Sequence, residues 1–118
     1  FLKASETELC PKPEYYFNET QRMNFAIYLE EKYPNLVKRF SIGESQGGRL
    51  IHGVEISDNP GISEKLEPEV KFVANIHGDE VVGNHLTLSF ACHLLTNYEN
   101  DSIIKNFVDN TRIFLLFS

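Results

Sequence analysis

The sequence has no cluster of lysine or arginine, and its 17 acidic side chains outnumber its 11 basic ones. A net charge of -6 without a basic patch argues against nucleic acid or an anionic membrane surface as a partner. No apolar run approaches the ~20 residues that a membrane-spanning helix needs, so no membrane anchoring is visible in this chain. Internal repeats, low-complexity tracts and flexible linkers are also missing, which favours a single domain.

The cellular compartment is indicated by few signals. The first ten residues contain no initiator methionine and lack the charged-then-apolar plan of a signal peptide, so we expect a mature or excised chain. Cys10 and Cys92 are compatible with one disulfide, with two buried thiols, or with a partner outside this sequence. Two N-x-[ST] triplets, beginning at Asn18 and Asn100, are candidate glycosylation sites and favour the secretory pathway or the extracellular space.

Hydrophobic periodicity predicts strands and helices around a packed core, in keeping with 42% hydrophobic side chains. Asn18 followed by Gln21 is typical of an N-cap with its capping-box partner, and Tyr33-Pro34 ends that helix. The expected elements are, in order, a helix from Asn18 to Tyr33, strands over 36–42 and 49–57 joined by a turn at 45–48, a strand over 70–76, a helix over 80–97, a short helix capped by Asp101, and a strand over 113–117.

The apolar side chains of each element fall on one face, which predicts where the core lies. Residues 70–76 are nearly all apolar, as in a central strand that is buried on both faces of a parallel or mixed sheet. The side chains expected to share a face are Met23, Ala26 and Ile27 in the first helix, Leu36, Phe40 and Ile42 and then Leu50, Val54 and Ile56 in the hairpin, and Val82, Leu86, Phe90, Ala91, Leu94 and Leu95 in the long helix.

The last strand, from Ile113 to Phe117, is also fully apolar and therefore needs a neighbour on each edge and a layer on each face. We expect further residues after Ser118 to complete these contacts. The predicted fold is an α/β domain with a mixed central β-sheet flanked by helices, incomplete at its C-terminus.

The strongest chemical candidate is the segment His77-Gly78-Asp79-Glu80, just beyond the C-terminal end of the strand at 70–76. An imidazole and a carboxylate three residues apart in a turn can face one metal ion, and both groups suit zinc. A catalytic zinc site takes three protein ligands and leaves one position for water, so two ligands do not complete a site. The alternative is a histidine in a turn beside a carboxylate that favours a helix N-terminus.

A second H-x-x-E run, from His52 to Glu55, shows that this spacing alone is weak evidence. It lies in a predicted strand, where residues i and i+3 project to opposite faces and cannot converge on one ion. We therefore interpret His52 as a structural histidine. His85 and His93 fall on the helix after Glu80, where a replacement third ligand is not expected.

Several segments together resemble the M14 metallocarboxypeptidases, specifically the subfamily that contains carboxypeptidases D, E, M and N. The resemblance runs from about Tyr15 to Leu116, in the order of that family's opening elements. The segments are Leu29-Glu30-Glu31-Lys32-Tyr33-Pro34-Asn35, Ser41-Ile42-Gly43-Glu44-Ser45 with Gly48-Arg49-Leu50, Glu55-Ile56-Ser57-Asp58-Asn59-Pro60-Gly61, and Phe72-Val73-Ala74-Asn75-Ile76-His77-Gly78-Asp79-Glu80-Val81-Val82-Gly83.

The resemblance implies that His77 and Glu80 are the first two ligands of a Zn²⁺ cofactor. It also implies that residues 1–118 are the N-terminal portion of a single metallocarboxypeptidase catalytic domain. Members of the subfamily remove C-terminal Arg or Lys from peptides and proteins, with zinc polarising the scissile carbonyl and its bound water. The family's third zinc ligand, catalytic glutamate and substrate-binding residues lie beyond this chain, so no catalytic residue falls within it. The ending at 114–118 departs from the family's Pro-Ser-containing continuation.

Two hypotheses for the function follow. In the first, a longer protein completes the zinc site and acts as an exopeptidase, and the isolated 118 residues are inactive or incomplete. In the second, the 118 residues are a catalytically inactive, secreted binding or interaction module. A serine or cysteine hydrolase is disfavoured, because the sequence has no G-x-S-x-G elbow and neither cysteine carries a catalytic signature.

Overall fold

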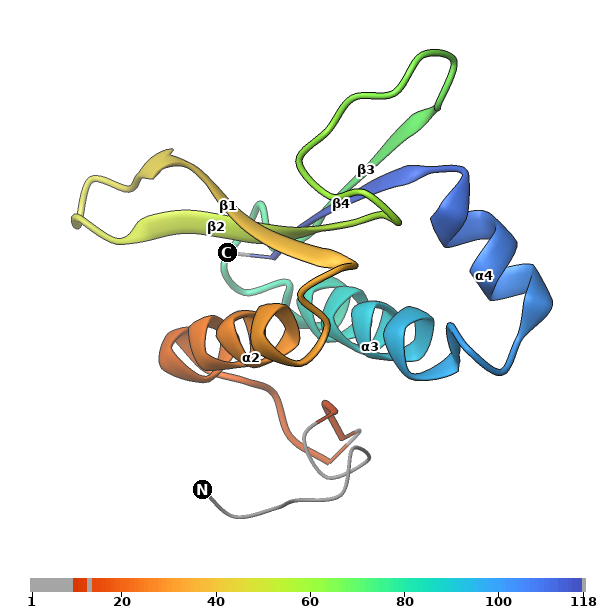
Figure 1. Cartoon of the computed structure of the whole chain (residues 1–118). Helices are drawn as coiled ribbons and strands as arrows, with labels where there is room; N and C mark the ends of the chain where they lie inside the picture. Colours follow the sequence, from red (N-terminus) through yellow and green to blue (C-terminus); the bar gives the residue numbers. More distant parts are fainter. Residues whose placement is uncertain (1–9, 13, 118) are drawn as a thin grey trace.

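The computed structural model describes residues 10–12 and 14–117 of the chain. A four-stranded sheet has its helices gathered on one side, below the sheet in the view of Figure 1. None of the helices in this described part is long and apolar enough to cross a membrane. The elements are, in order, α2 (Glu19–Lys32), β1 (Val37–Glu44), β2 (Leu50–Ile56), β3 (Glu69–Val73), α3 (Val81–Asn97), α4 (Ser102–Asp109) and β4 (Arg112–Leu116).

The sheet is mixed and follows the strand order β1-β2-β4-β3. β1 and β2 form the predicted antiparallel hairpin, in which Val37 lies opposite Ile56 and Glu44 lies opposite Leu50. β4 pairs antiparallel with β2 and parallel with β3. The last strand of the chain therefore has a neighbour on both edges, as its apolar sequence requires. The α/β class with a mixed sheet, expected from the sequence, is confirmed.

Helix α2 begins and ends where the sequence predicts. The Asn18 Oδ1 accepts a hydrogen bond from the Gln21 backbone N–H (2.9 Å), and the Gln21 Oε1 accepts one from the Asn18 N–H (2.8 Å). This capping box satisfies two donors near the helix start that have no partner within the helix. At the other end the Tyr33 N–H donates to the Leu29 carbonyl, and Pro34 has no N–H with which to continue the ladder.

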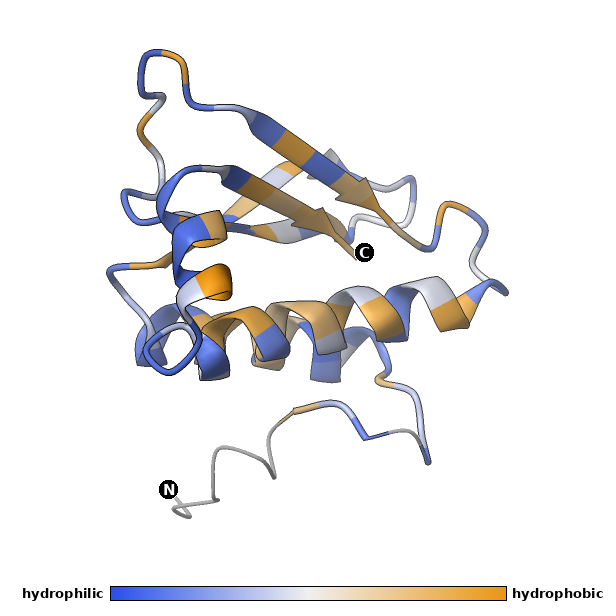
Figure 2. Ribbon diagram, turned by 90° about the vertical axis from the view of Figure 1, so that its right-hand side faces the viewer, coloured by the Kyte–Doolittle hydropathy of each residue, from blue (hydrophilic) through white to orange (hydrophobic). Residues whose placement is uncertain are grey.

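The two helices between β3 and β4 form a crossover, because these strands are parallel neighbours. Asp101 caps α4 as predicted, since its Oδ1 accepts hydrogen bonds from the N–H groups of Ile103 (2.9 Å) and Ile104 (3.2 Å). The view in Figure 2 confirms that the helices lie under a single face of the sheet. The apolar side chains buried between sheet and helices are Phe25, Ala26, Leu29, Val37, Val54, Ile56, Leu88, Ala91, Cys92, Leu94, Leu95, Val108, Ile113, Leu115 and Phe117.

The predicted position of the strand at 70–76 is wrong. β3 lies at the edge of the sheet, and its Phe72 and Val73 side chains are 42% and 54% exposed. Among the described residues no strand pairs with its outer edge, and no helix covers the face that points away from α3. No residue of this run is fully buried: Val70 and Ala74 are partly buried, whereas Phe72, Val73 and Ile76 are exposed.

The buried face of the hairpin also differs from the prediction in β1. Val37 is the β1 residue that is buried against the helices. Phe40 instead packs edge-to-face on Phe114, with ring centroids 5.8 Å apart. Cross-strand partners in the ladder place these two rings on the sheet face opposite to the helices. Ile42 and Leu50 are 63% and 44% exposed, because the hairpin extends beyond the helices in Figure 1.

In α2 the buried face is centred on Phe25, Ala26 and Leu29, so Met23 and Ile27 lie at its margins rather than at its centre.

The predicted face of α3 is right in the second half of the helix, where Ala91, Leu94 and Leu95 are buried. In the first half, Val82 and Leu86 are 57% and 62% exposed, because the helix begins beside the uncovered edge of the sheet.

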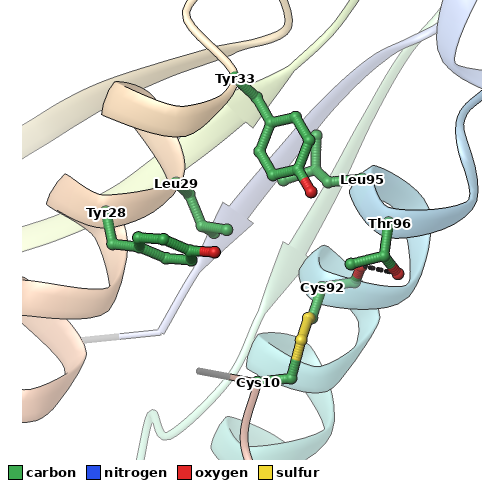
Figure 3. Close-up of a pocket in the computed structure, with 7 residues that line it drawn as sticks. All are labelled: Cys10, Tyr28, Leu29, Tyr33, Cys92, Leu95 and Thr96. Atoms are coloured by element: carbon green, nitrogen blue, oxygen red, sulfur yellow. Dashed lines mark hydrogen bonds between the residues drawn. A yellow bond between two sulfur atoms is a disulfide. The ribbon is translucent and has the colours of Figure 1, made fainter. Parts of the chain in front are cut away.

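Cys10 and Cys92 form a disulfide, with their Cα atoms 5.9 Å apart. Of the three states that the sequence leaves open, the structure shows this one. The bond attaches the segment before α2 to α3, close to Tyr28 and Leu29 of α2 (Figure 3). Because the two cysteines are 82 residues apart in sequence, the disulfide closes a loop that contains α2 and the first three strands.

Candidate metal centre

The predicted metal ligands lie in the turn between β3 and α3. The β3 ladder ends where the Ala74 N–H donates to the Leu116 carbonyl (2.9 Å). Asn75 then adopts a left-handed backbone conformation, with φ 63°. The Glu80 N–H donates to the His77 carbonyl (3.0 Å) and closes the turn. The turn therefore stands at the C-terminal ends of two parallel strands, where α/β folds usually place their ligand sites.

The side chains of His77 and Glu80 face each other across this turn. His77 Nδ1 lies 3.1 Å from Glu80 Oε2, and the two side chains are 72% and 65% exposed. Glu80 is the N-cap residue of α3, but its side chain makes no capping hydrogen bond. Its carboxylate is turned back toward the imidazole at the start of α3, a placement that the metal-ligand hypothesis shares with the alternative of a carboxylate that favours a helix N-terminus.

The two donor atoms are close enough to share one zinc ion. Zinc binds imidazole nitrogen at about 2.0–2.1 Å and carboxylate oxygen at about 2.0–2.2 Å, so two such donors lie at most about 4.3 Å apart. The separation of 3.1 Å between His77 Nδ1 and Glu80 Oε2 satisfies this limit. An imidazole and a carboxylate are also a donor set that suits Zn²⁺. The residues present therefore fit the metal.

No third donor joins the pair in residues 10–12 and 14–117. The group of three His, Cys, Asp or Glu donors found there within 4.8 Å of one another is Asp58, Glu64 and Glu67, not a group around the turn. His85 and His93 lie on α3, as predicted, and belong to no such group. The described chain brings two ligands together and supplies no third.

The second H-x-x-E run lies in β2, as predicted. The His52 side chain is buried, and its ring packs edge-to-face on Phe117 with centroids 5.4 Å apart. Glu55 projects to the other face of the strand, where the Arg112 guanidinium binds it. The two side chains are separated by the sheet and cannot bind one ion, in agreement with strand periodicity.

The acidic group Asp58, Glu64 and Glu67 was not predicted from the sequence. It lies in the loop before β3, at the opposite end of that strand from His77. Partial burial, together with the charges of Glu64 and Asp58, raises the pKa of Glu67 above its ordinary value. Asp58 and Glu64 are exposed, and such surface carboxylates commonly bind no ion, so we assign no site here.

Two asparagines near the turn were also missed. Asn84 is buried on α3, and its Nδ2 donates to the Phe117 carbonyl (2.5 Å), which ties the first turn of the helix to the end of β4. Asn75 carries the left-handed conformation before His77. The sequence contained a signal for each of them. Asn84 is a polar residue on the apolar face of a helix, and Asn75 is an asparagine at the point where an apolar strand ends.

The family described as zinc carboxypeptidase matches residues 23–118 of the chain. Human carboxypeptidase D is 38% identical over 113 residues, a match that covers 96% of this chain and 8% of that protein. The mouse carboxypeptidase N catalytic chain is 42% identical over 84 residues, covering 70% of this chain and 18% of that protein. The chain thus spans a small part of the length of these curated relatives.

Solved structures of similar fold agree with the sequence matches. Carboxypeptidase A from Helicoverpa armigera has a TM-score of 0.74 at 24% identity, over 86% of this chain and 24% of that chain. Thrombin activatable fibrinolysis inhibitor has a TM-score of 0.72 at 17% identity, over 87% of this chain and 25% of that chain. At these identities the likeness shows the fold alone: the sheet and helices correspond to about a quarter of each larger structure.

Proposed function

The chain belongs to the zinc carboxypeptidase family, N/E subfamily, and on that basis we propose that it is the N-terminal part of a catalytic domain that removes C-terminal residues from peptides or proteins. The observation that carries the proposal is the pair His77 and Glu80, whose donor atoms lie 3.1 Å apart in a turn at the ends of parallel strands. Peptide and protein C-termini are the proposed substrates, and Arg or Lys is the proposed terminal residue.

In this proposal, His77 Nδ1 and Glu80 Oε2 are two of the three protein ligands of Zn²⁺. Zinc supplies polarisation of the scissile carbonyl and of a bound water when it is present. The Glu80 carboxylate offsets part of the charge of the ion, and the His77 ring holds its donor nitrogen toward the same point. Both side chains are more than half exposed, which leaves an approach for a peptide C-terminus and for ligands from another part of the protein.

The remaining groups of the site are proposed to come from residues that follow this chain in a longer protein. These are a third ligand histidine, a glutamate base, and an arginine that binds the terminal carboxylate of the substrate. The relatives and solved structures are several times longer than this chain, which supports the proposal. The uncovered edge of β3 gives further support, because exposed apolar side chains on an edge strand need covering.

The test is hydrolysis by the protein expressed from its complete reading frame. Peptides ending in Arg or Lys are expected to lose that residue, and the same peptides with a C-terminal amide are expected to stay intact. His77→Ala and Glu80→Gln are expected to lower kcat/KM by about 100-fold or more, because even outer-shell partners of zinc ligands cost 10–100-fold.

His93→Ala is the matched control, since it removes an imidazole from the exposed side of α3 and should leave the activity unchanged. Equal activity of His77→Ala and wild type would contradict the assignment of the ligand.

A second candidate function is a catalytically inactive, secreted binding module. The observation that favours it is the outer edge of β3, with which no strand of residues 10–12 and 14–117 pairs and where the exposed side chains of Phe72 and Val73 offer a surface for another chain. This hypothesis predicts weak zinc binding by two ligands and concentration-dependent self-association of the 118-residue chain. Sedimentation of the protein isolated from its native source, with its mass and zinc content, separates it from the enzyme hypothesis, which predicts a longer protein with a complete zinc site.

We also propose N-glycosylation at Asn18 and Asn100 in the secretory pathway. Both residues are exposed, and a disulfide is compatible with an oxidising compartment. The glycan would attach to the Asn18 Nδ2, which leaves the Oδ1 free to accept the capping hydrogen bond from Gln21. Asn18→Asp keeps this acceptor but removes the sequon, so a loss of mass in that variant expressed in secretory cells would report the glycan without loss of the cap.

A further inference from the structure

We propose that Asn75 is a positioning residue for the zinc site, because its left-handed backbone turns the chain out of β3 so that His77 and Glu80 meet. The inference rests on the proposed function, since it concerns the same two ligands. Asn75 is not itself a ligand, and it acts through the path of the backbone that it allows.

The backbone conformation of Asn75 is unusual for a residue with a side chain. Its φ of 63° lies in the left-handed region, which residues other than glycine rarely adopt and which asparagine tolerates better than most. Leu66, with φ 67°, is the other non-glycine residue with positive φ in the described part of the chain, and it lies in the loop before β3. The two left-handed residues thus stand at opposite ends of the same strand.

The left-handed residue separates the strand from the ligand turn. Up to Ala74 the chain still pairs with β4, through the Ala74 N–H and the Leu116 carbonyl (2.9 Å). Two residues after Asn75 the backbone has already entered the turn that the Glu80 N–H closes on His77. A residue confined to the β region at 75 would carry His77 further along the strand direction, away from the start of α3.

Helix α3 returns close to the end of the strand immediately after the turn. A Cβ placed on Gly83 would lie 3.8 Å from the Ala74 Cβ, which is ordinary contact. The chain therefore reverses tightly between Ala74 and Gly83. Asn75 is the non-glycine residue with a positive φ in this reversal, and we infer that the reversal depends on it. The position of Glu80 at the helix start follows from the same reversal.

The side chain of Asn75 is not what holds the turn. Its Oδ1 is buried and has no hydrogen-bond partner within the described residues. We infer that Asn75 acts through its backbone, because asparagine tolerates the positive φ that the turn requires. Glycine, which adopts this conformation without steric cost, should replace asparagine, whereas a β-branched residue should not.

The experiment is a titration of the metal-free protein, expressed from its complete reading frame, with zinc chloride alone, followed through the imidazole NMR signals of His77. His52, His85 and His93 serve as reference signals in the same spectrum. We expect Asn75→Gly to bind zinc at His77 with an affinity within about twofold of wild type. We expect Asn75→Val to bind about tenfold more weakly, which corresponds to about 1.4 kcal/mol, the order of the cost of the left-handed conformation.

Leu66→Val is the matched control. It introduces the same β-branched side chain at a second left-handed position, at the far end of β3, and should leave the zinc affinity of His77 unchanged. Asn75→Ala, which also lacks glycine's freedom but strains the backbone less, replaces Asn75→Val if the valine variant does not fold. Wild-type affinity in Asn75→Val, or in Asn75→Ala where it replaces the valine variant, would overturn the proposal, as would an equal loss in the control Leu66→Val.

A measurement without metal separates this inference from the zinc assignment. Exchange of the Glu80 amide hydrogen reports the bond to the His77 carbonyl that closes the turn. Asn75→Val is expected to speed this exchange by about tenfold while Asn75→Gly leaves it near the wild-type rate. If wild-type His77 shows no response to zinc, the proposed function fails; if zinc binds but the turn is unchanged in Asn75→Val, the positioning role alone fails.

Discussion

Glu55, which is buried, and Arg112, which is partly buried, form a two-point ion pair between the neighbouring strands β2 and β4. The Arg112 Nε and Nη2 donate to the two carboxylate oxygens of Glu55 at 3.1 Å each. The Gly61 N–H donates to the same carboxylate (2.8 Å), so the pair also anchors the loop that follows β2. The Glu55 and Arg112 side chains are only 6% and 12% exposed. This pair lies on the sheet face opposite to the helices and uses the carboxylate of the second H-x-x-E run.

Glu55→Gln is expected to lower the free energy of unfolding by up to about 3 kcal/mol, because it leaves a partly buried guanidinium with Glu69, 3.6 Å away, as its remaining carboxylate partner. Urea unfolding followed by circular dichroism measures the change. Glu30→Gln is the control, since Glu30 Oε1 and Arg39 Nε also lie 3.1 Å apart but the side chains are 35% and 40% exposed. This exposed pair should contribute less than about 1 kcal/mol. Equal losses in the two variants would show that burial does not set the strength of the pair.

Removal of the disulfide by Cys10→Ala and Cys92→Ala together is expected to destabilise the chain by up to about 4.5 kcal/mol. The loop-closure estimate for a separation of 82 residues gives this value, since the cross-link limits the unfolded chain. Thermal unfolding of wild type with and without a reducing agent is the companion measurement. Wild type should fall to the level of the double variant under reduction, and the double variant should not respond. A reductant-dependent shift in the double variant would mean that another group is the target.

Glu67 should make the protein less stable as the pH rises. Burial, and then the charges of Glu64 and Asp58, raise the pKa of Glu67 above its ordinary 4.5, so the folded state holds this proton more tightly than the unfolded state. The stability that the proton confers is present below pH 4.5 and is lost as the pH rises through the higher folded pKa.

Glu67→Gln is therefore expected to be more stable than wild type at neutral pH and to approach wild type in acid. Urea midpoints of both proteins across this range give the result. Glu31→Gln, which removes a charge from the exposed side of α2, should show no such convergence. If wild type instead became more stable relative to Glu67→Gln as the pH rises, the difference in stability would have the opposite sign and would contradict this expectation.

Gly53→Ala is expected to cost about 3 kcal/mol or more, or to prevent folding, because small-to-large changes in a packed site force the backbone apart. A Cβ at this position would collide with the Leu115 carbonyl oxygen and lie 2.9 Å from the Phe40 Cζ. At Gly47, in the hairpin turn, the nearest heavy atom is the Ser45 Oγ at 3.8 Å, so Gly47→Ala should change stability by less than about 0.5 kcal/mol. Similar unfolding midpoints for the two alanine variants would contradict the close approach of β2 and β4.

Helix limits were predictable from the sequence because their signals are local. Asn18 and Asp101 cap helices through side-chain oxygens a few residues from the backbone groups that they bind, and Pro34 ends a ladder by its own chemistry. The existence and type of each element followed from such signals and from hydrophobic period. The exposure of the Val82 and Leu86 side chains could not be predicted in this way, because it depends on which strand lies beside the helix.

The place of β3 in the sheet was not predictable from its residues. An apolar run over 70–76 is compatible with any strand that has a covered face, and the order β1-β2-β4-β3 depends on pairing between segments far apart in sequence. The spacing of His77 and Glu80, with the strand before them, indicated that their side chains can turn toward one point, and they lie 3.1 Å apart; their role as metal ligands stays a prediction. The role of Asn75 was missed because a single φ is not encoded by hydrophobic period.

The most direct test of the central claim is an anomalous difference map, recorded at the zinc absorption edge from crystals of the protein grown with one equivalent of zinc. We expect a peak at about 2.0–2.1 Å from the His77 Nδ1 and about 2.0–2.2 Å from a Glu80 carboxylate oxygen. A peak at the acidic group Asp58, Glu64 and Glu67, or at His77 without Glu80, would contradict the assignment of this turn as the zinc site.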